Sequence, residues 1–109
     1  MKKHYTKGMP SVIHNVRQCW VCKSANVEEH HVFFGRNRNN AERYGYKVWL
    51  CPKHHRGRPD GVHGGNRELD LRLKRIGQRH FERMFDREKF IEVFGKSYIW
   101  DDFENNEKE

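Results

Sequence analysis

The stretch YKVWLCPKHH, residues 46–55, is a β-prone run that closes on a Cys-x-x-His turn. A similar turn, Cys19-x-x-Cys22, lies upstream. Each turn brings two side chains together, so the two turns can surround one ion, and three thiolates with one imidazole suit tetrahedral Zn²⁺. The spacing therefore predicts a structural zinc held by Cys19, Cys22, Cys51 and one histidine, either His54 or His55.

Around this stretch the chain predicts a small α+β domain. A second β-prone run at residues 31–34 and the run at residues 46–50 are expected to form a wide hairpin. Residues 35–40, GRNRNN, show no periodicity and are expected to form a polar loop between the two strands.

Two helices are expected after the hairpin. Asn66 is a good N-cap for the first helix, and a shorter helix over about residues 87–94 should end at Gly95, which favours a left-handed C-cap. The first helix carries an apolar stripe that we expect in the core. The stripe consists of Leu69, Leu73, Ile76, His80 and Met84, widened by Phe81 and Phe85.

Composition and charge narrow the classes of function. The chain of 109 residues has a formal net charge of +7. Its last nine residues carry five carboxylates and one lysine, so the other hundred residues carry +11. A segment with this positive charge attracts polyanions, and nucleic acid is the leading candidate. The alternative is that the charges only form a solvated surface.

The domain organisation follows from the same composition. We expect a loosely ordered basic arm at residues 1–17, one folded domain at residues 18–99 and a disordered acidic tail at residues 100–109. The sequence has neither a membrane-spanning run nor the apolar stretch of a signal peptide, which favours a cytoplasmic location and no membrane partner. Three cysteines in a reducing compartment favour metal binding over disulfides.

Arginines are also arranged in a pattern. They recur on a second face of the predicted first helix, and two more occupy the polar loop, so these side chains form either a solvated surface or a phosphate-binding surface. The candidate nucleic-acid contacts are Arg36, Arg38, Arg72, Arg75, Arg79 and Arg83.

Histidines remain after the zinc site is filled, and most of them cluster around the two turns. The segments HHVFFG, RYGYKVWLC, GVHGG, GQRHFE and FIEVFGKSY resemble the HNH family of His-Me finger nucleases, most closely small phage-encoded members. The likeness covers about residues 18–99. It implies a ββα-metal unit, in which two strands and a helix surround one catalytic divalent ion.

The resemblance also implies roles for individual histidines. His31 maps to the general base, and His30 and His55 map to ligands of a catalytic Mg²⁺ or Mn²⁺, which leaves His54 to the zinc. His63 is an additional candidate for a metal or phosphate contact. The family's asparagine has no counterpart near Gly45 or Tyr46, and the nearest asparagines, Asn37, Asn39 and Asn40, lie earlier in the chain.

The function implied is a metal-dependent DNA endonuclease that nicks or cuts DNA in a phage or prophage setting. A histidine suits the base because its pKa lies near neutrality, and a divalent ion suits the charge that develops on the phosphate. The first alternative is a non-catalytic zinc-containing protein that binds nucleic acid as an accessory. The second is a zinc-stabilised protein-interaction domain.

Overall fold

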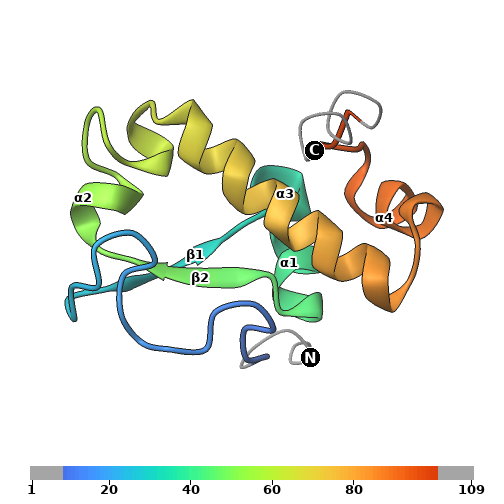
Figure 1. Ribbon diagram of the computed structural model, residues 1–109, viewed down its shortest axis with the longest axis horizontal. Helices are drawn as coiled ribbons and strands as arrows, with labels where there is room; N and C mark the ends of the chain where they lie inside the picture. The colour runs from blue at the N-terminus through green and yellow to red at the C-terminus, as the bar shows by residue number, and fades with distance from the viewer. Residues whose placement is uncertain (1–8, 101–109) are drawn as a thin grey trace, which may run out of the picture.

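A computed structural model describes residues 9–100 and has the α+β architecture that the sequence predicts (Figure 1). Strands β1 (Glu28–His31) and β2 (Lys47–Leu50) pair antiparallel, with Glu28 opposite Leu50 and His31 opposite Lys47. The second strand lies where it was predicted. The first lies earlier than the predicted residues 31–34, because Val32 and Phe33 leave the strand and are buried in the core.

The connection between the strands is helical, so the prediction of a polar loop at residues 35–40 is wrong. A 3₁₀ turn, η1 (Gly35–Asn37), leads into α1 (Arg38–Tyr44), which ends at Gly45 with φ at +84°. Asn37 and Asn40 donate from Nδ2 to the carbonyls of Phe94 and Val93, each at 3.0 Å. These tertiary bonds satisfy carbonyls at the end of another helix and hold the segment in place, which local propensity does not report.

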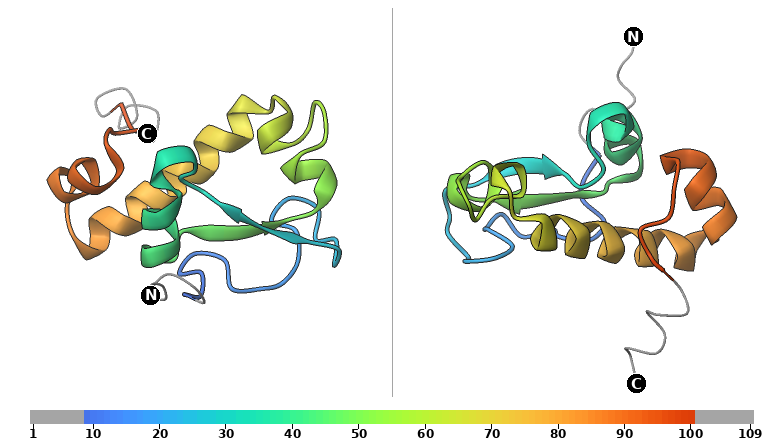
Figure 2. Two further views of the ribbon diagram at one scale, coloured as in Figure 1. Left: turned by 180° about the vertical axis from the view of Figure 1, so that it is seen from behind. Right: turned by 90° about the horizontal axis from the view of Figure 1, so that it is seen from above.

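Four further helical segments complete the fold. After β2 come α2 (Pro52–His55), η2 (Val62–Gly64), α3 (Arg67–Met84) and α4 (Arg87–Phe94). Two capping predictions are confirmed, because Asn66 Oδ1 accepts from the Leu69 N–H at 3.0 Å and Gly95 is left-handed with φ at +95°. Helix α3 crosses one face of the hairpin, while α2 and α4 lie toward opposite ends of the molecule (Figure 2).

An aromatic cluster forms the core between the hairpin and the helices. The ring of Phe33 lies 4.4 Å from Phe94 and 5.4 Å from Phe90, measured between centroids. From the predicted α3 stripe, Leu73 and Phe81 are fully buried, but Met84 is 65% exposed and Phe85 is 50% exposed. The prediction that the stripe is core throughout is therefore wrong at the end of α3.

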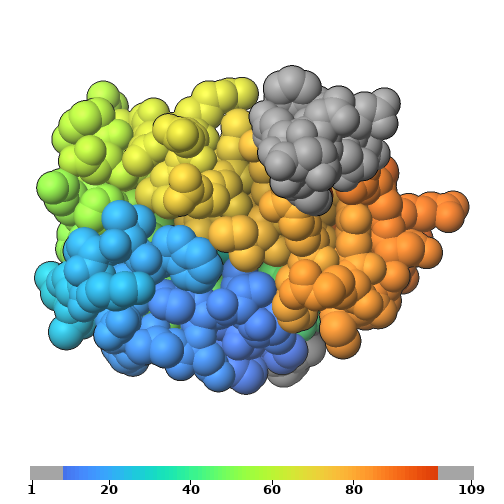
Figure 3. Space-filling view, viewed as in Figure 1, coloured from blue at the N-terminus to red at the C-terminus, as the bar shows by residue number. Residues whose placement is uncertain are grey.

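The described part of the N-terminal arm is ordered by contacts with the hairpin. Ser11 Oγ donates to the Lys47 carbonyl at 2.6 Å, and His14 Nδ1 accepts from the Trp49 N–H at 3.1 Å. In the space-filling view this segment lies beside α3 on one face (Figure 3). The expectation of a loose arm is thus wrong for this segment, whereas residues 1–8 and 101–109 lie outside the described residues.

None of the helices within residues 9–100 has the length and apolar character needed to cross a membrane.

Candidate functional site

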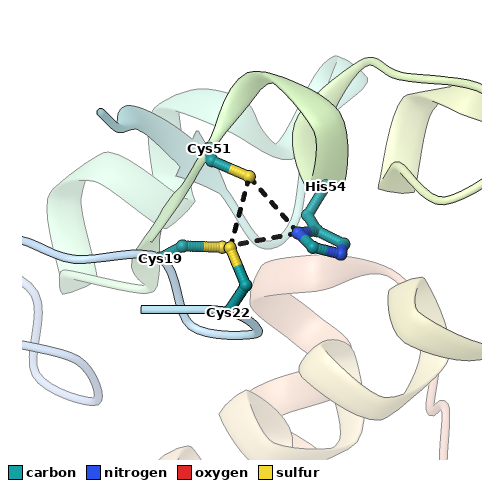
Figure 4. Close-up of side chains that lie close together, drawn as sticks. All are labelled: Cys19, Cys22, Cys51 and His54. Carbon is teal, nitrogen blue, oxygen red and sulfur yellow. Dashed lines mark hydrogen bonds between the residues drawn. The ribbon is translucent and has the colours of Figure 1, made fainter. Parts of the chain in front are cut away.

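The two predicted turns come together at one end of the hairpin. Cys19 and Cys22 belong to the turn before β1, whereas Cys51 follows β2 directly and His54 lies in α2. Their side chains point toward one another (Figure 4). The Sγ atoms of Cys22 and Cys51 are 3.7 Å apart, and His54 Nδ1 lies 3.3 Å from Cys51 Sγ and 3.7 Å from Cys19 Sγ.

These spacings fit a tetrahedral metal ion. Zn–S bonds of about 2.3 Å place two sulfurs about 3.8 Å apart, close to the distance between Cys22 and Cys51. The Val21 N–H also donates to Cys19 Sγ at 3.4 Å. Burial alone would raise the pKa of Cys19, but backbone N–H groups of Cys22, Cys51 and Val21 lower that pKa to about 6. The four residues could therefore hold a metal ion, and the donor set is compatible with zinc.

The structure distinguishes the two adjacent histidines. His54 directs Nδ1 at the thiols, whereas His55 is buried in a second group with His30 and His63. Successive residues of a helix point about 100° apart, so α2 can supply one histidine to each group.

The second group consists of histidines from three elements. His30 comes from β1, His55 from α2 and His63 from η2, and their ligand atoms lie within 4.8 Å of one another. His30 is 1% exposed, and its Nε2 is buried without a hydrogen-bond partner in residues 9–100. Burial, together with the nearby His55 and His63, lowers the pKa of His30 to about 3. The ring is therefore neutral and carries the lone pair that a metal ligand requires.

The chemistry of the three imidazoles indicates which ions this group can take. Imidazole suits Zn²⁺, Ni²⁺, Cu²⁺ and other transition ions, whereas Mg²⁺ prefers oxygen donors. In the described residues the group of three contains no carboxylate. Of the two catalytic ions expected from the sequence, Mn²⁺ fits these donors better than Mg²⁺.

Glu28 holds His55 and was not identified from the sequence. Its Oε1 accepts from His55 Nδ1–H at 2.5 Å, which leaves Nε2 as the nitrogen with a free lone pair. A carboxylate two positions before His30 on a strand lies on the same face as that histidine, so period-2 alternation was the signal.

His31 belongs to a different set of contacts. Its Nε2–H donates to Glu42 Oε1 at 2.6 Å, and Lys47 Nζ lies 3.2 Å from Glu42 Oε2 and 3.1 Å from Glu29 Oε2. Neighbouring residues on a strand alternate between faces, and the side chain of His31 contacts Glu42 of α1 and not the group that contains His30. The structure thus brings His30, His55 and His63 together and leaves His31 beside that group, not within it.

His31, Glu42 and Lys47 form a buried polar network, with the exposed Glu29 at its edge. Glu29, His31 and Glu42 also have ligand atoms within 4.8 Å of one another, but the Lys47 ammonium already lies among these carboxylates. Burial would raise the pKa of Glu42, but hydrogen bonds from His31 and Lys47 hold that pKa below its usual value. Sequence reasoning missed Glu42, since α1 was not expected, and it therefore also missed the contact of Lys47 with this carboxylate.

The candidate phosphate-binding arginines differ in their surroundings. Arg36 in η1 and Arg38 at the start of α1 are exposed, as are Arg72 and Arg83 on α3. Arg75 instead donates from Nε to the Tyr98 carbonyl at 2.9 Å.

A groove lies where the N-terminal segment meets α3. It has a volume of about 440 Å³ and is lined by Val12, Ile13, Ile76, Arg79, His80 and Arg83. Arg79 and Arg83 therefore border an accessible concave surface.

Comparisons with protein-family models, curated proteins and solved structures found no match to this chain, so its function is inferred from the clusters themselves.

Proposed function

We propose that this protein is a metal-dependent DNA endonuclease built on a ββα-metal unit of the HNH type. One observation carries the proposal: the hairpin holds two separate ligand groups, Cys19–Cys22–Cys51–His54 and His30–His55–His63. A structural zinc needs only the first group, so it does not account for three converging histidines, one of which is buried with an unpaired nitrogen.

In this proposal the first group holds a structural zinc. Cys19 and Cys22 precede β1, and Cys51 and His54 follow β2, so a shared ion would cross-link the two strands at the open end of the hairpin. Such a cross-link would stabilise the fold of a chain with only 35% hydrophobic residues, because its hydrophobic core alone is small.

The histidine group would bind the catalytic divalent ion. When bound, that ion supplies positive charge to the scissile phosphate and to the leaving oxygen. His30, His55 and His63 are the residues that would hold it, and Glu28 fixes the ring of His55.

His31 would act as the general base. Glu42 accepts a hydrogen bond from Nε2–H, which leaves Nδ1 with the lone pair that can take a proton from the attacking water. The Lys47 ammonium keeps Glu42 ionised, so this carboxylate orients the imidazole and stabilises its protonated form.

DNA is the proposed substrate because the first hundred residues carry +11 and the candidate arginines Arg36, Arg38, Arg72 and Arg83 are exposed. Phe34 lies against His30 and His63 and is followed by Gly35, where the segment with Arg36 and Arg38 begins. Arg56, which follows His55 directly, is a further exposed cation at this place. The guanidinium groups of Arg36, Arg38 and Arg56 are suited to bind phosphates on either side of the cleaved bond.

A second candidate function is a non-catalytic zinc-containing protein that binds nucleic acid. The burial of His31 favours it, because a side chain that is 8% exposed and bonded to Glu42 also suits a purely structural role. A protein-interaction domain has no comparable observation in its favour.

Plasmid nicking separates these candidates. Zinc-loaded protein with Mn²⁺ should convert supercoiled DNA to the nicked or linear form, and EDTA should stop the reaction. His63→Ala removes an exposed ligand and should abolish cleavage at low Mn²⁺, whereas the exposed control Lys53→Ala should cleave normally. If the wild type binds DNA but cleaves it with none of Mn²⁺, Mg²⁺, Ni²⁺ or Co²⁺, the accessory role replaces the endonuclease.

A further inference from the structure

An ion pair on α3 lies beside the histidine group. Asp70 Oδ2 is 3.0 Å from Lys74 Nζ, and both side chains are largely buried, with exposures of 19% and 12%. Residues four apart on an exposed helix surface usually form such pairs with little energetic gain. This pair differs because it is covered by aromatic rings.

Ring contacts connect the pair to the histidines. Lys74 Nζ lies 4.2 Å from the centre of the Phe34 ring. That ring is 4.8 Å from His63 and 5.8 Å from His30, measured between centroids. The pair is therefore separated from the ligand group by one aromatic side chain.

The other oxygen of Asp70 has no partner. Within residues 9–100 two buried side-chain polar atoms lack a hydrogen bond, and they are Asp70 Oδ1 and His30 Nε2. A buried carboxylate oxygen without a donor is costly, so such an atom usually has a function or an additional partner. Both unpaired atoms occur in this one region of the molecule.

Electrostatic effects agree with this placement. Burial lowers the pKa of His63, as do His55 and Arg56, whereas the charge of Asp70 opposes the shift. Burial and the same carboxylate raise the pKa of Tyr98, whose ring is 5.3 Å from Lys74 Nζ. Asp70 is thus close enough to His63 for its charge to act on that imidazole.

We propose that Asp70 is an outer-sphere carboxylate of the histidine group, with Oδ1 accepting a hydrogen bond from water carried by the bound ion. The ligand atoms that lie within 4.8 Å of one another do not include Asp70, so contact through water fits better than direct ligation. Three neutral imidazoles leave the ion's charge uncompensated, and a buried carboxylate nearby offsets it. This inference rests on metal binding by the histidine group and not on DNA cleavage.

The test is Mn²⁺ affinity of the full-length, zinc-loaded protein, read from the electron paramagnetic resonance signal of free Mn²⁺. Asp70→Asn should weaken binding about 10- to 100-fold, the usual effect of losing an outer-sphere partner. Glu68→Gln is the matched control, because it removes the same charge from the same turn of α3 at an exposed position. Its affinity should stay within about twofold of the wild type, since only outer-sphere partners are expected to matter.

The variant Lys74→Met provides a second test, because the change in Mn²⁺ affinity that we expect from it has the opposite direction. If Asp70 served only to pair with Lys74, both variants would change affinity alike. In our proposal Lys74→Met removes a like charge near the ion and should tighten Mn²⁺ binding, even if Asp70→Asn fails to fold. Unchanged affinity in Asp70→Asn, or weaker binding in Lys74→Met, overturns the proposal. A wild type that binds no Mn²⁺ would overturn this inference together with the proposed catalytic ion.

Discussion

His55 donates its Nδ1–H to Oε1 of Glu28 across 2.5 Å, and this bond joins α2 to β1. The contact fixes both the rotation of the ring and its tautomer, so that Nε2 carries the lone pair. His55 follows His54 of the cysteine group directly, and the Glu28 carboxylate on β1 thus holds it in a separate group.

Glu28→Gln should therefore weaken metal binding by the histidine group and leave zinc binding by the cysteine group unchanged. We expect Mn²⁺ affinity to fall about 10- to 100-fold, because a carboxylate partner of a ligating histidine raises its basicity and orients it. Metal analysis should still find zinc in the purified variant. Glu29→Gln, on the same strand but facing Lys47, is the control, and equal losses in both variants would contradict the specific role of Glu28.

Zinc removal should unfold the protein. Structural zinc binding contributes about 10–16 kcal/mol of apparent free energy, as much as the whole stability of a typical domain, about 5–15 kcal/mol. Cys51→Ser should lose zinc and show no cooperative thermal transition by circular dichroism. Lys53→Ser, an exposed change inside the same turn, should melt like the wild type. A cooperative transition that survives complete chelation would rule out a structural zinc.

DNA binding should depend on Arg72 and Arg83, the exposed ones among the four candidate arginines of α3, more than on the other two candidates. Arg72→Ala with Arg83→Ala should lower the slope of log affinity against log salt by up to about two, one for each lost phosphate contact. Arg75→Ala should instead lower stability, since its guanidinium binds the Tyr98 carbonyl and lies 4.6 Å from the Trp100 ring centre. Fluorescence anisotropy at several salt concentrations measures the slope, and an unchanged slope in the double variant places these arginines toward solvent.

The buried neutral His30 makes stability fall in acid. Its pKa is about 3 in the folded protein but 6.5 when unperturbed, so between these values the unfolded chain binds a proton that the native state does not. Stability should therefore rise with pH across this window, by up to about 1.4 kcal/mol per pH unit from this one group. Urea melts of zinc-loaded protein without added Mn²⁺, at pH 5.5 and 6.5, should show a smaller difference for His30→Leu. An equal difference in that variant would assign the acid sensitivity to other groups.

Local features were predictable from the sequence. The Cys-x-x-Cys and Cys-x-x-His turns bring their side chains together within four residues, and the caps at Asn66 and Gly95 depend on neighbouring backbone groups. Such features need no knowledge of distant packing, which is why they are confirmed.

Features that depend on distant contacts were not predictable. Helix α1 is held by side-chain bonds from Asn37 and Asn40 to carbonyls more than fifty positions away. The strand position of EEHH is likewise set by partners elsewhere, since Glu28 meets His55 and His31 meets Glu42. Neither the propensity of VFF nor the polarity of GRNRNN reports these contacts, so the tertiary structure overrides both.

The decisive variant for the proposed function is His31→Gln. A glutamine can still donate to Glu42, so the buried network with Lys47 should survive, whereas alanine would leave Glu42 without that donor. Zinc content, Mn²⁺ affinity and DNA affinity should stay close to wild type, because a base acts on the transition state and contributes little to binding. Cleavage should fall about 10²- to 10⁴-fold, the usual effect of losing a general base.

The dependence on metal concentration then distinguishes a base from a ligand. Raised Mn²⁺ should partly restore His63→Ala, whose defect is weaker binding of the ion, because added ion refills a weakened site by mass action. It should not restore His31→Gln, which lacks a proton acceptor. Full cleavage by His31→Gln would show that His31 only supports α1 through Glu42, and the base would have to be sought elsewhere. Loss of cleavage that raised Mn²⁺ repairs in both variants would instead place His31 among the residues that hold the ion.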